Sequence, residues 1–187
     1  AALATVNASG STGAVSVGAT ANASQVAMTI TAGSGGLTAD GGTAADTMTG
    51  GAGVDSFDGN GGNDTLTGAA GDDDLDGGAG NDTLDGGAGD DTITTGAGND
   101  TVTGGAGADT ITIAANYTLL DSIDGGDGDD ILVGNNGDDQ FDGGTGADTI
   151  TTGSGSDTVI LRAGDGGTEL TDADIITDFT DGVDVIG

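Results

Sequence analysis

A repeat of nine residues runs through most of this chain and constrains its fold more than any other feature. Eight nonapeptides follow one another without a gap over residues 41–112, and four more cover residues 125–160. Every unit has an aspartate at its sixth position and an apolar residue at its eighth. The aspartates are Asp46, Asp55, Asp64, Asp73, Asp82, Asp91, Asp100, Asp109, Asp130, Asp139, Asp148 and Asp157. Repeats of short fixed period are typical of solenoids, in which each unit packs only against its neighbours.

The segment between the two runs of repeats, residues 113–124, keeps part of the pattern. Asp121 and Ile123 have the same spacing as the aspartate and the apolar residue of a regular unit. An insertion of three residues around Ala114 would therefore account for the interruption. We expect one continuous structure with a surface loop that carries Tyr117, and we count Asp121 with the repeat aspartates.

The unit GGAGNDTLD (77–85) shows how one repeat is expected to fold. Its glycines suit the positive φ angles of repeated tight turns. Its last three residues place Leu84 between two polar residues, as in a very short strand whose middle side chain points inward. Two units would then form one coil, and stacked coils would give two parallel sheets with the apolar residues between them.

The composition of the chain excludes several classes of function. Of 187 residues, 42 are glycine and 32 are acidic, against one base, and the net charge is −31. Nucleic acid and anionic lipid would be repelled by this charge. There is no apolar run of about 20 residues that could be inserted in a membrane. Without a ligand, a chain of this composition is expected to be disordered, because it buries little and repels itself.

Stacked turns would bring the aspartates into two columns, with adjacent coils about 4.8 Å apart. Such columns need cations between the carboxylates. Calcium suits them, because it takes six to eight oxygen ligands with flexible geometry, whereas magnesium prefers to keep several waters. The chain has no His and no Cys, which argues against zinc and copper. We therefore predict several bound Ca²⁺ ions, at roughly 8 to 11 positions, and folding coupled to their binding.

The nonapeptides resemble the repeats-in-toxin (RTX) motif G-G-x-G-x-D-x-U-x, a known calcium-binding repeat. The resemblance implies an all-β fold, a right-handed parallel β-roll (a β-helix or solenoid) with calcium between stacked glycine-rich turns. It also implies that the sixth-position aspartates are side-chain ligands, to which we add Asp121. Type I secretion by a bacterium, to the extracellular space or the cell surface, is a further implication.

The chain outside the repeats is expected to form the two ends of the roll. Residues 1–40 are rich in Ala, Thr and Val, and counting back by nines puts Ile30 at the apolar position and Met28 at the aspartate position. We interpret this segment as a metal-poor cap or connection, and residues 41–160 as the RTX roll. Residues 161–187 are predicted to be a C-terminal cap, whose segment 174–179 resembles the one that closes RTX rolls. The apolar residues expected to cover the last coil are Ile175, Ile176, Phe179, Val183, Val185 and Ile186.

The expected function is structural rather than catalytic. The chain has no His and no Lys, so the usual general bases and Schiff-base nucleophiles are missing. It resembles the bacterial S-layer proteins built on RTX repeats, which favours a secreted protein that forms a homo-oligomer or polymer and attaches to cell-surface polysaccharide. The alternative is a calcium-triggered folding and export module of a larger type I-secreted enzyme, toxin or adhesin. An ice-binding roll is disfavoured, because the third position is mostly Ala rather than Thr.

Overall fold

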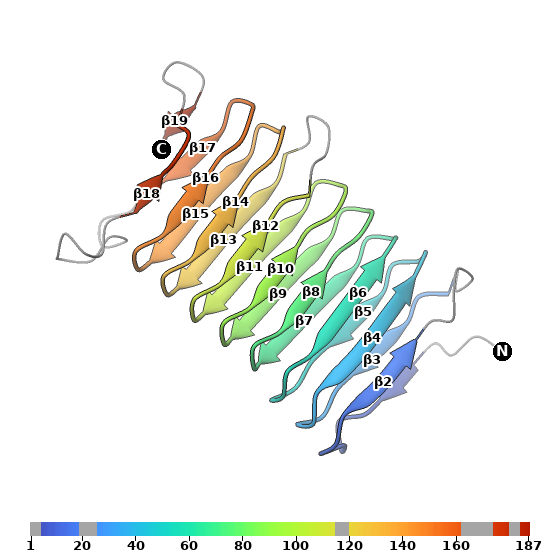
Figure 1. Ribbon diagram of the computed structural model, residues 1–187. Helices are drawn as coiled ribbons and strands as arrows, with labels where there is room; N and C mark the ends of the chain where they lie inside the picture. The colour runs from blue at the N-terminus through green and yellow to red at the C-terminus, as the bar shows by residue number, and fades with distance from the viewer. Residues whose placement is uncertain (1–4, 19–25, 115–119, 162–173, 180–183) are drawn as a thin grey trace.

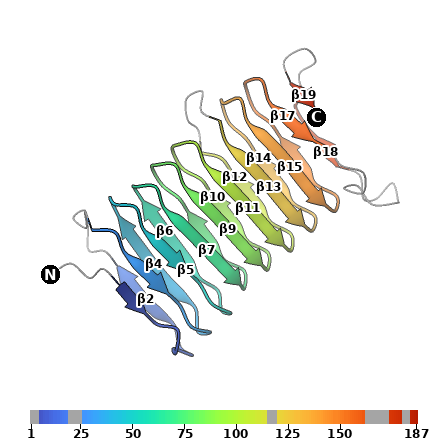
Figure 2. The ribbon, with the colours of Figure 1, turned by 180° about the vertical axis from the view of Figure 1, so that it is seen from behind.

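The computed structural model describes residues 5–18, 26–114, 120–161, 174–179 and 184–187. All regular elements in these residues are β-strands, and no helix in them is long and apolar enough to cross a membrane. The chain coils into a parallel β-solenoid, which confirms the predicted fold class. Figures 1 and 2 show a row of stacked coils with the two termini at opposite ends.

Two parallel sheets face each other along the solenoid, and each coil adds one strand to both. Sheet A contains, in spatial order, β1 (Thr5–Asn7), β3 (Thr29–Thr31), β5 (Thr47–Thr49), β7 (Thr65–Ala70), β9 (Thr83–Ala88), β11 (Thr101–Ala106), β13 (Ser122–Asp127), β15 (Gln140–Thr145), β17 (Thr158–Ile160) and β19 (Val185–Ile186). Sheet B contains β2 (Val15–Gly18), β4 (Leu37–Gly42), β6 (Ser56–Asn60), β8 (Asp74–Asp76), β10 (Thr92–Thr94), β12 (Thr110–Thr112), β14 (Ile131–Val133), β16 (Thr149–Thr151) and β18 (Ile175–Ile176).

The register of the strands follows the repeat. Leu66 pairs with Leu84, and Leu84 with Val102, so that identical repeat positions are stacked one coil apart. Val102 then pairs with Ile123 rather than with the residue 18 positions later. Asp121 is likewise 21 residues from its partner Asp100, whereas the regular separation is 18. Three extra residues therefore restore the phase, as predicted; Tyr117 lies outside the described residues.

The core between the sheets is one side chain thick. The middle residue of each repeat strand points inward, and all twelve eighth-position residues are at most 2% exposed. They are Met48, Phe57, Leu66, Leu75, Leu84, Ile93, Val102, Ile111, Leu132, Phe141, Ile150 and Val159. Each contributes about 1.5–3 kcal/mol by burial. Because each strand contributes only one such residue, the core is small for a chain of this length.

The two ends of the solenoid continue the same coil. Ile30 pairs with Met48 in the repeat register, and Met28 is buried at the aspartate position. At the other end, β18 and β19 add a strand to each sheet. Ile176 packs against the core, whereas Ile175 and Val185 are more than half exposed. Phe179 is 38% and Ile186 51% exposed, and Val183 lies outside the described residues. β18 and β19 thus add a further, partly exposed coil at this end.

Candidate metal centre

The glycines of each turn are required for two different reasons. In the unit 77–85, Gly78 and Gly80 have φ angles of 92° and 146°, in the region that only glycine adopts readily. Gly77 has no such angle, but a Cβ atom there would lie 2.8 Å from Asp82 Oδ2 and 2.4 Å from the Thr95 carbonyl oxygen. Positive φ therefore explains the second and fourth positions. At Gly77 the first position is glycine because a side chain there would crowd the oxygens of the turn, a reason that the sequence did not reveal.

All thirteen predicted aspartates lie in two columns that run along the turns. Each is at most 2% exposed, and its Oδ1 accepts a hydrogen bond from the backbone one coil earlier. The Asp64 N–H donates to Asp82 Oδ1 at 2.8 Å, and the Asp82 N–H donates to Asp100 Oδ1 at 2.9 Å. One column contains Asp46, Asp64, Asp82, Asp100, Asp121, Asp139 and Asp157, and the other contains Asp55, Asp73, Asp91, Asp109, Asp130 and Asp148.

Two further aspartates extend the columns, and the sequence interpretation missed them. The Asp148 N–H donates to Asp174 Oδ1 and the Asp157 N–H donates to Asp184 Oδ1, both at 3.2 Å. The signal was present in the sequence, because each precedes an apolar residue by two positions, as DII (174–176) and DVI (184–186). The incomplete glycine pattern before both residues concealed it. Within the described residues, seven aspartate pairs in one column and six in the other are now linked from coil to coil.

Among the residues that the structure describes, the second carboxylate oxygen of most of these aspartates has no hydrogen-bond partner. In eleven of the thirteen, Oδ2 is buried without a hydrogen bond, an arrangement that costs free energy unless a ligand compensates it. At Gly68, a Cβ would lie 2.4 Å from Asp73 Oδ2 and 2.6 Å from the Gly86 carbonyl oxygen of the next coil. Carboxylate and carbonyl oxygens therefore border the same small space.

The oxygens around this space are those that calcium prefers. Calcium is bound at about 2.3–2.6 Å by carboxylates and backbone carbonyls in flexible geometry. Within the described part of the chain, no three His, Cys, Asp or Glu side chains converge on one point. The oxygens that border each space are one aspartate Oδ2 and the carbonyl of the next coil, as at Gly68, and further turn carbonyls could complete the shell. The residues present thus suit a calcium ion between successive turns.

Burial makes the charged form of these aspartates unfavourable in the absence of a cation. Burial, reinforced by the neighbouring carboxylates of the column, raises the pKa of Asp82, Asp91 and Asp130 to about 7, although backbone N–H donors oppose it. The same causes raise the pKa of a second group to about 6: Asp64, Asp100, Asp139 and Asp148. A cation beside each carboxylate would reverse this effect, because an opposite charge favours the ionised form.

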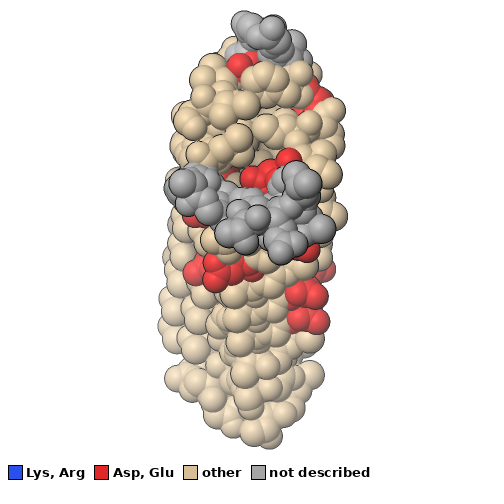
Figure 3. All heavy atoms as spheres, turned by 90° about the vertical axis from the view of Figure 1, so that its left-hand side faces the viewer, with Lys and Arg blue, Asp and Glu red and all other residues tan. Residues whose placement is uncertain are grey.

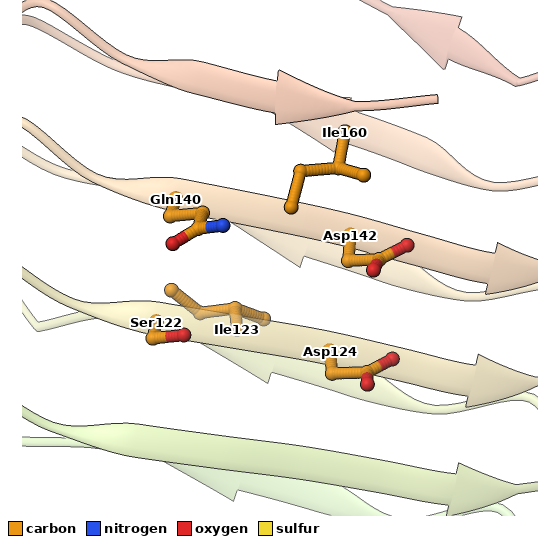
Figure 4. Close-up of a pocket in the computed structure, with 6 residues that line it drawn as sticks. All are labelled: Ser122, Ile123, Asp124, Gln140, Asp142 and Ile160. Carbon is orange, nitrogen blue, oxygen red and sulfur yellow. The ribbon is translucent and has the colours of Figure 1, made fainter. Parts of the chain in front are cut away.

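A separate pocket of about 150 Å³ lies on the outer face of sheet A (Figure 4). Asp124 and Asp142, which pair across β13 and β15, line it together with Ser122, Gln140 and Ile160. It belongs to the outer face and not to the turn columns. The surface in Figure 3 shows acidic side chains and no basic one; the single base, Arg162, lies outside the described residues.

Comparison with known proteins identifies the repeat. A family model described as the RTX calcium-binding nonapeptide repeat matches residues 40–75, 76–111, 121–141 and 133–166, more than half of the chain. No match was found among curated proteins or among solved structures. The matched ranges contain all thirteen predicted aspartates, and calcium is the ion that this repeat binds.

Proposed function

The chain belongs to the family of proteins built on the RTX calcium-binding nonapeptide repeat, and on this premise we propose that it is a secreted structural protein. It folds on extracellular calcium and assembles with copies of itself into a cell-surface layer or filament. Proteins with this repeat are generally secreted by bacteria, which agrees with folding outside the cell.

The observation that carries the proposal is the row of buried Oδ2 atoms without a protein partner. The aspartates of adjacent coils would hold calcium together with turn carbonyls, and the bound ions would neutralise the columns. The thin core alone offers little stability, so binding and folding are one event. Extracellular calcium modules typically bind at about 10⁻⁴–10⁻³ M. That range keeps the chain unfolded before export and folds it afterwards.

Self-assembly is supported by the two ends of the solenoid. Among the described strands, β1 and β2 end the sheets on one side, and β18 and β19 end them on the other. Terminal strands present unpaired backbone groups to a further strand. Ile175, Val185 and Ile186 are at least half exposed at the second end. Contact between unlike ends generates an open filament wherever the head-to-tail rotation does not close into a ring.

The alternative is a calcium-triggered folding and export module of a larger type I-secreted enzyme, toxin or adhesin. The calcium-binding turns would serve such a module equally well. The two functions differ only in whether the ends of the solenoid bind further copies of the chain. Attachment to cell-surface polysaccharide would be an additional property of the assembled layer. We expect no catalytic activity from the chain itself.

A calcium titration of the chelated chain distinguishes these functions. Circular dichroism follows sheet formation while light scattering and electron microscopy follow assembly. Cooperative sheet formation followed by ordered assemblies supports the structural protein. Sheet formation with a monomer at every concentration overturns self-assembly and leaves the module. If calcium changes neither signal, the calcium-dependent fold itself is refuted.

A further inference from the structure

Thr95 is an exception at the first position of the repeat turn. Glycine occupies this position in most units, and Gly77 is its equivalent one coil earlier. The Thr95 side chain is completely buried, with an exposed fraction of 0%. Its hydroxyl oxygen has no hydrogen-bond partner among the described residues. A buried hydroxyl of this kind requires an explanation, because it has lost its water without gaining a protein partner.

The equivalent first position one coil earlier shows which space a side chain at this point of the turn faces. At Gly77, a Cβ would lie 2.8 Å from the carboxylate of its own unit and 2.4 Å from the carbonyl oxygen of the next coil. Burial raises the pKa of Asp100 to about 6, and the nearby Thr95 hydroxyl lowers it. The hydroxyl is thus close to Asp100, although it does not meet hydrogen-bond geometry. Asp100 Oδ2 is itself buried without a partner.

Thr152, at the same position of a later unit, provides a comparison within the chain. Its hydroxyl donates to Asp178 Oδ1 at 3.1 Å, and the same carboxylate accepts from the backbone N–H of Thr152 and of Gly153. The protein thus supplies an acceptor for Thr152. For Thr95 the described residues supply no hydrogen-bond acceptor. Asp100 Oδ2, which is also buried without a hydrogen-bond partner, belongs to the neighbouring carboxylate.

We propose that the Thr95 hydroxyl is an additional calcium ligand beside Asp100. This inference rests on the proposed calcium binding in the turns and assigns to one site a side-chain oxygen that the glycine units lack. A hydroxyl oxygen has two lone pairs and can bind a cation without adding charge. Calcium takes six to eight oxygens, so the hydroxyl replaces a water or completes the shell.

Three variants of the full chain test the role of the hydroxyl. Thr95→Val keeps the shape and removes the oxygen, Thr95→Ser keeps the oxygen, and Thr94→Val changes the neighbouring threonine as a matched control. We expect Thr95→Val to raise the calcium midpoint of sheet formation roughly two- to fivefold. Thr95→Ser and Thr94→Val should stay near the original value.

The sign of the Thr95→Val effect separates this proposal from a purely structural role. An unpartnered buried hydroxyl that binds nothing should be improved by a methyl group, which would lower the midpoint. A lowered or unchanged midpoint therefore overturns the inference.

A crystal structure of the calcium-loaded chain gives the direct answer. The expected result is a cation at about 2.3–2.6 Å from Thr95 Oγ1. Cations in the other turns with none beside Thr95 would overturn only this inference. Turns without any cation would overturn the proposed function as well.

Discussion

At the scale of the residue, the turn is organised around the sixth-position carboxylate. Oδ1 accepts a hydrogen bond from a backbone N–H of the preceding coil, and Oδ2 faces the space that the first-position glycine leaves open. One side chain thus connects adjacent coils and leaves a second oxygen that would bind the ion. This double use explains why aspartate recurs at every unit, since asparagine would keep the hydrogen bond but lose the charge.

Asp82→Asn tests the charge of one such carboxylate. The amide oxygen can still accept the Asp64 N–H, so the coil contact is retained. We expect the calcium midpoint of folding to rise roughly threefold to tenfold, because calcium affinity depends on the number of charged ligands. Asp85→Asn, in the same unit but exposed, is the control. Equal effects of the two substitutions would mean that net charge rather than the site is responsible.

Gly68→Ala tests the space at the first position. The added Cβ would lie 2.4 Å from Asp73 Oδ2. We expect a loss of about 1–3 kcal/mol of calcium-loaded stability from overpacking, measured by chemical denaturation. Gly18→Ala is the control, since nothing lies within 4 Å of its Cβ. A tolerated Gly68→Ala would contradict the spatial reason for this glycine.

At the scale of the element, the strands are short, and most strands of the repeat region bury a single apolar side chain. β10 and β12 consist of three residues, and only the middle isoleucine of each is fully buried. No such strand is stable alone, so its position depends on the strands of the coils before and after it. The stability of the roll is accordingly the sum of many similar contacts between neighbours.

Leu84→Ala measures the contribution of one strand to the core. Leu84 is 1% exposed between β7 and β11. Its truncation should cost about 2–5 kcal/mol in the calcium-loaded state. Thr83→Ala, on the exposed side of the same strand, should stay within about 0.5 kcal/mol. A small effect of Leu84→Ala in thermal or chemical unfolding would show that calcium alone determines the stability.

At the scale of the whole molecule, the dominant quantity is charge. The chain has a net charge of −31, and its described part contains no basic side chain that could pair with the acidic ones. Many of the acids lie in the two buried columns, where neither water nor a base compensates them. The calcium-free roll is therefore destabilised by its own carboxylates, and calcium and protons compete to neutralise them.

The pH dependence should have opposite signs with and without calcium. The pKa of Asp82 is raised from 3.8 to about 7 in the fold. In chelator, this group stabilises the fold fully below pH 3.8 and loses that contribution as the pH rises through 7. Sheet content of the chelated chain, followed by circular dichroism, should therefore be higher at pH 4 than at pH 8.

With calcium present, protons should compete with the ion for the same oxygens. The calcium midpoint is expected to rise as the pH falls from 8 to about 5.5, through the raised pKa values of the columns. Light scattering controls for aggregation at the lower pH. A midpoint independent of pH over this interval would show that the column carboxylates are not the ligands.

The repeat phase, the inward-facing residue of each unit, the two parallel sheets and the two aspartate columns could all be predicted from the sequence. These properties depend on the nine-residue period, which is local and visible in any unit. The calcium prediction also followed from it, because stacked carboxylates need a hard cation. Asp121 keeps the repeat spacing after the three-residue insertion, and its predicted place in the column is confirmed.

Two features could be seen only in the folded structure. One is which residues outside the repeat extend the aspartate columns, and the other is which buried oxygens have no hydrogen-bond partner among the described residues. Asp174 and Asp184 enter the columns because β18 and β19 pair with the preceding coil, although neither follows the full glycine pattern of a repeat turn. The spatial role of the first-position glycine, and the buried hydroxyl of Thr95, depend on atoms of the next coil. Such contacts connect residues 18 or more positions apart, which a local pattern does not specify.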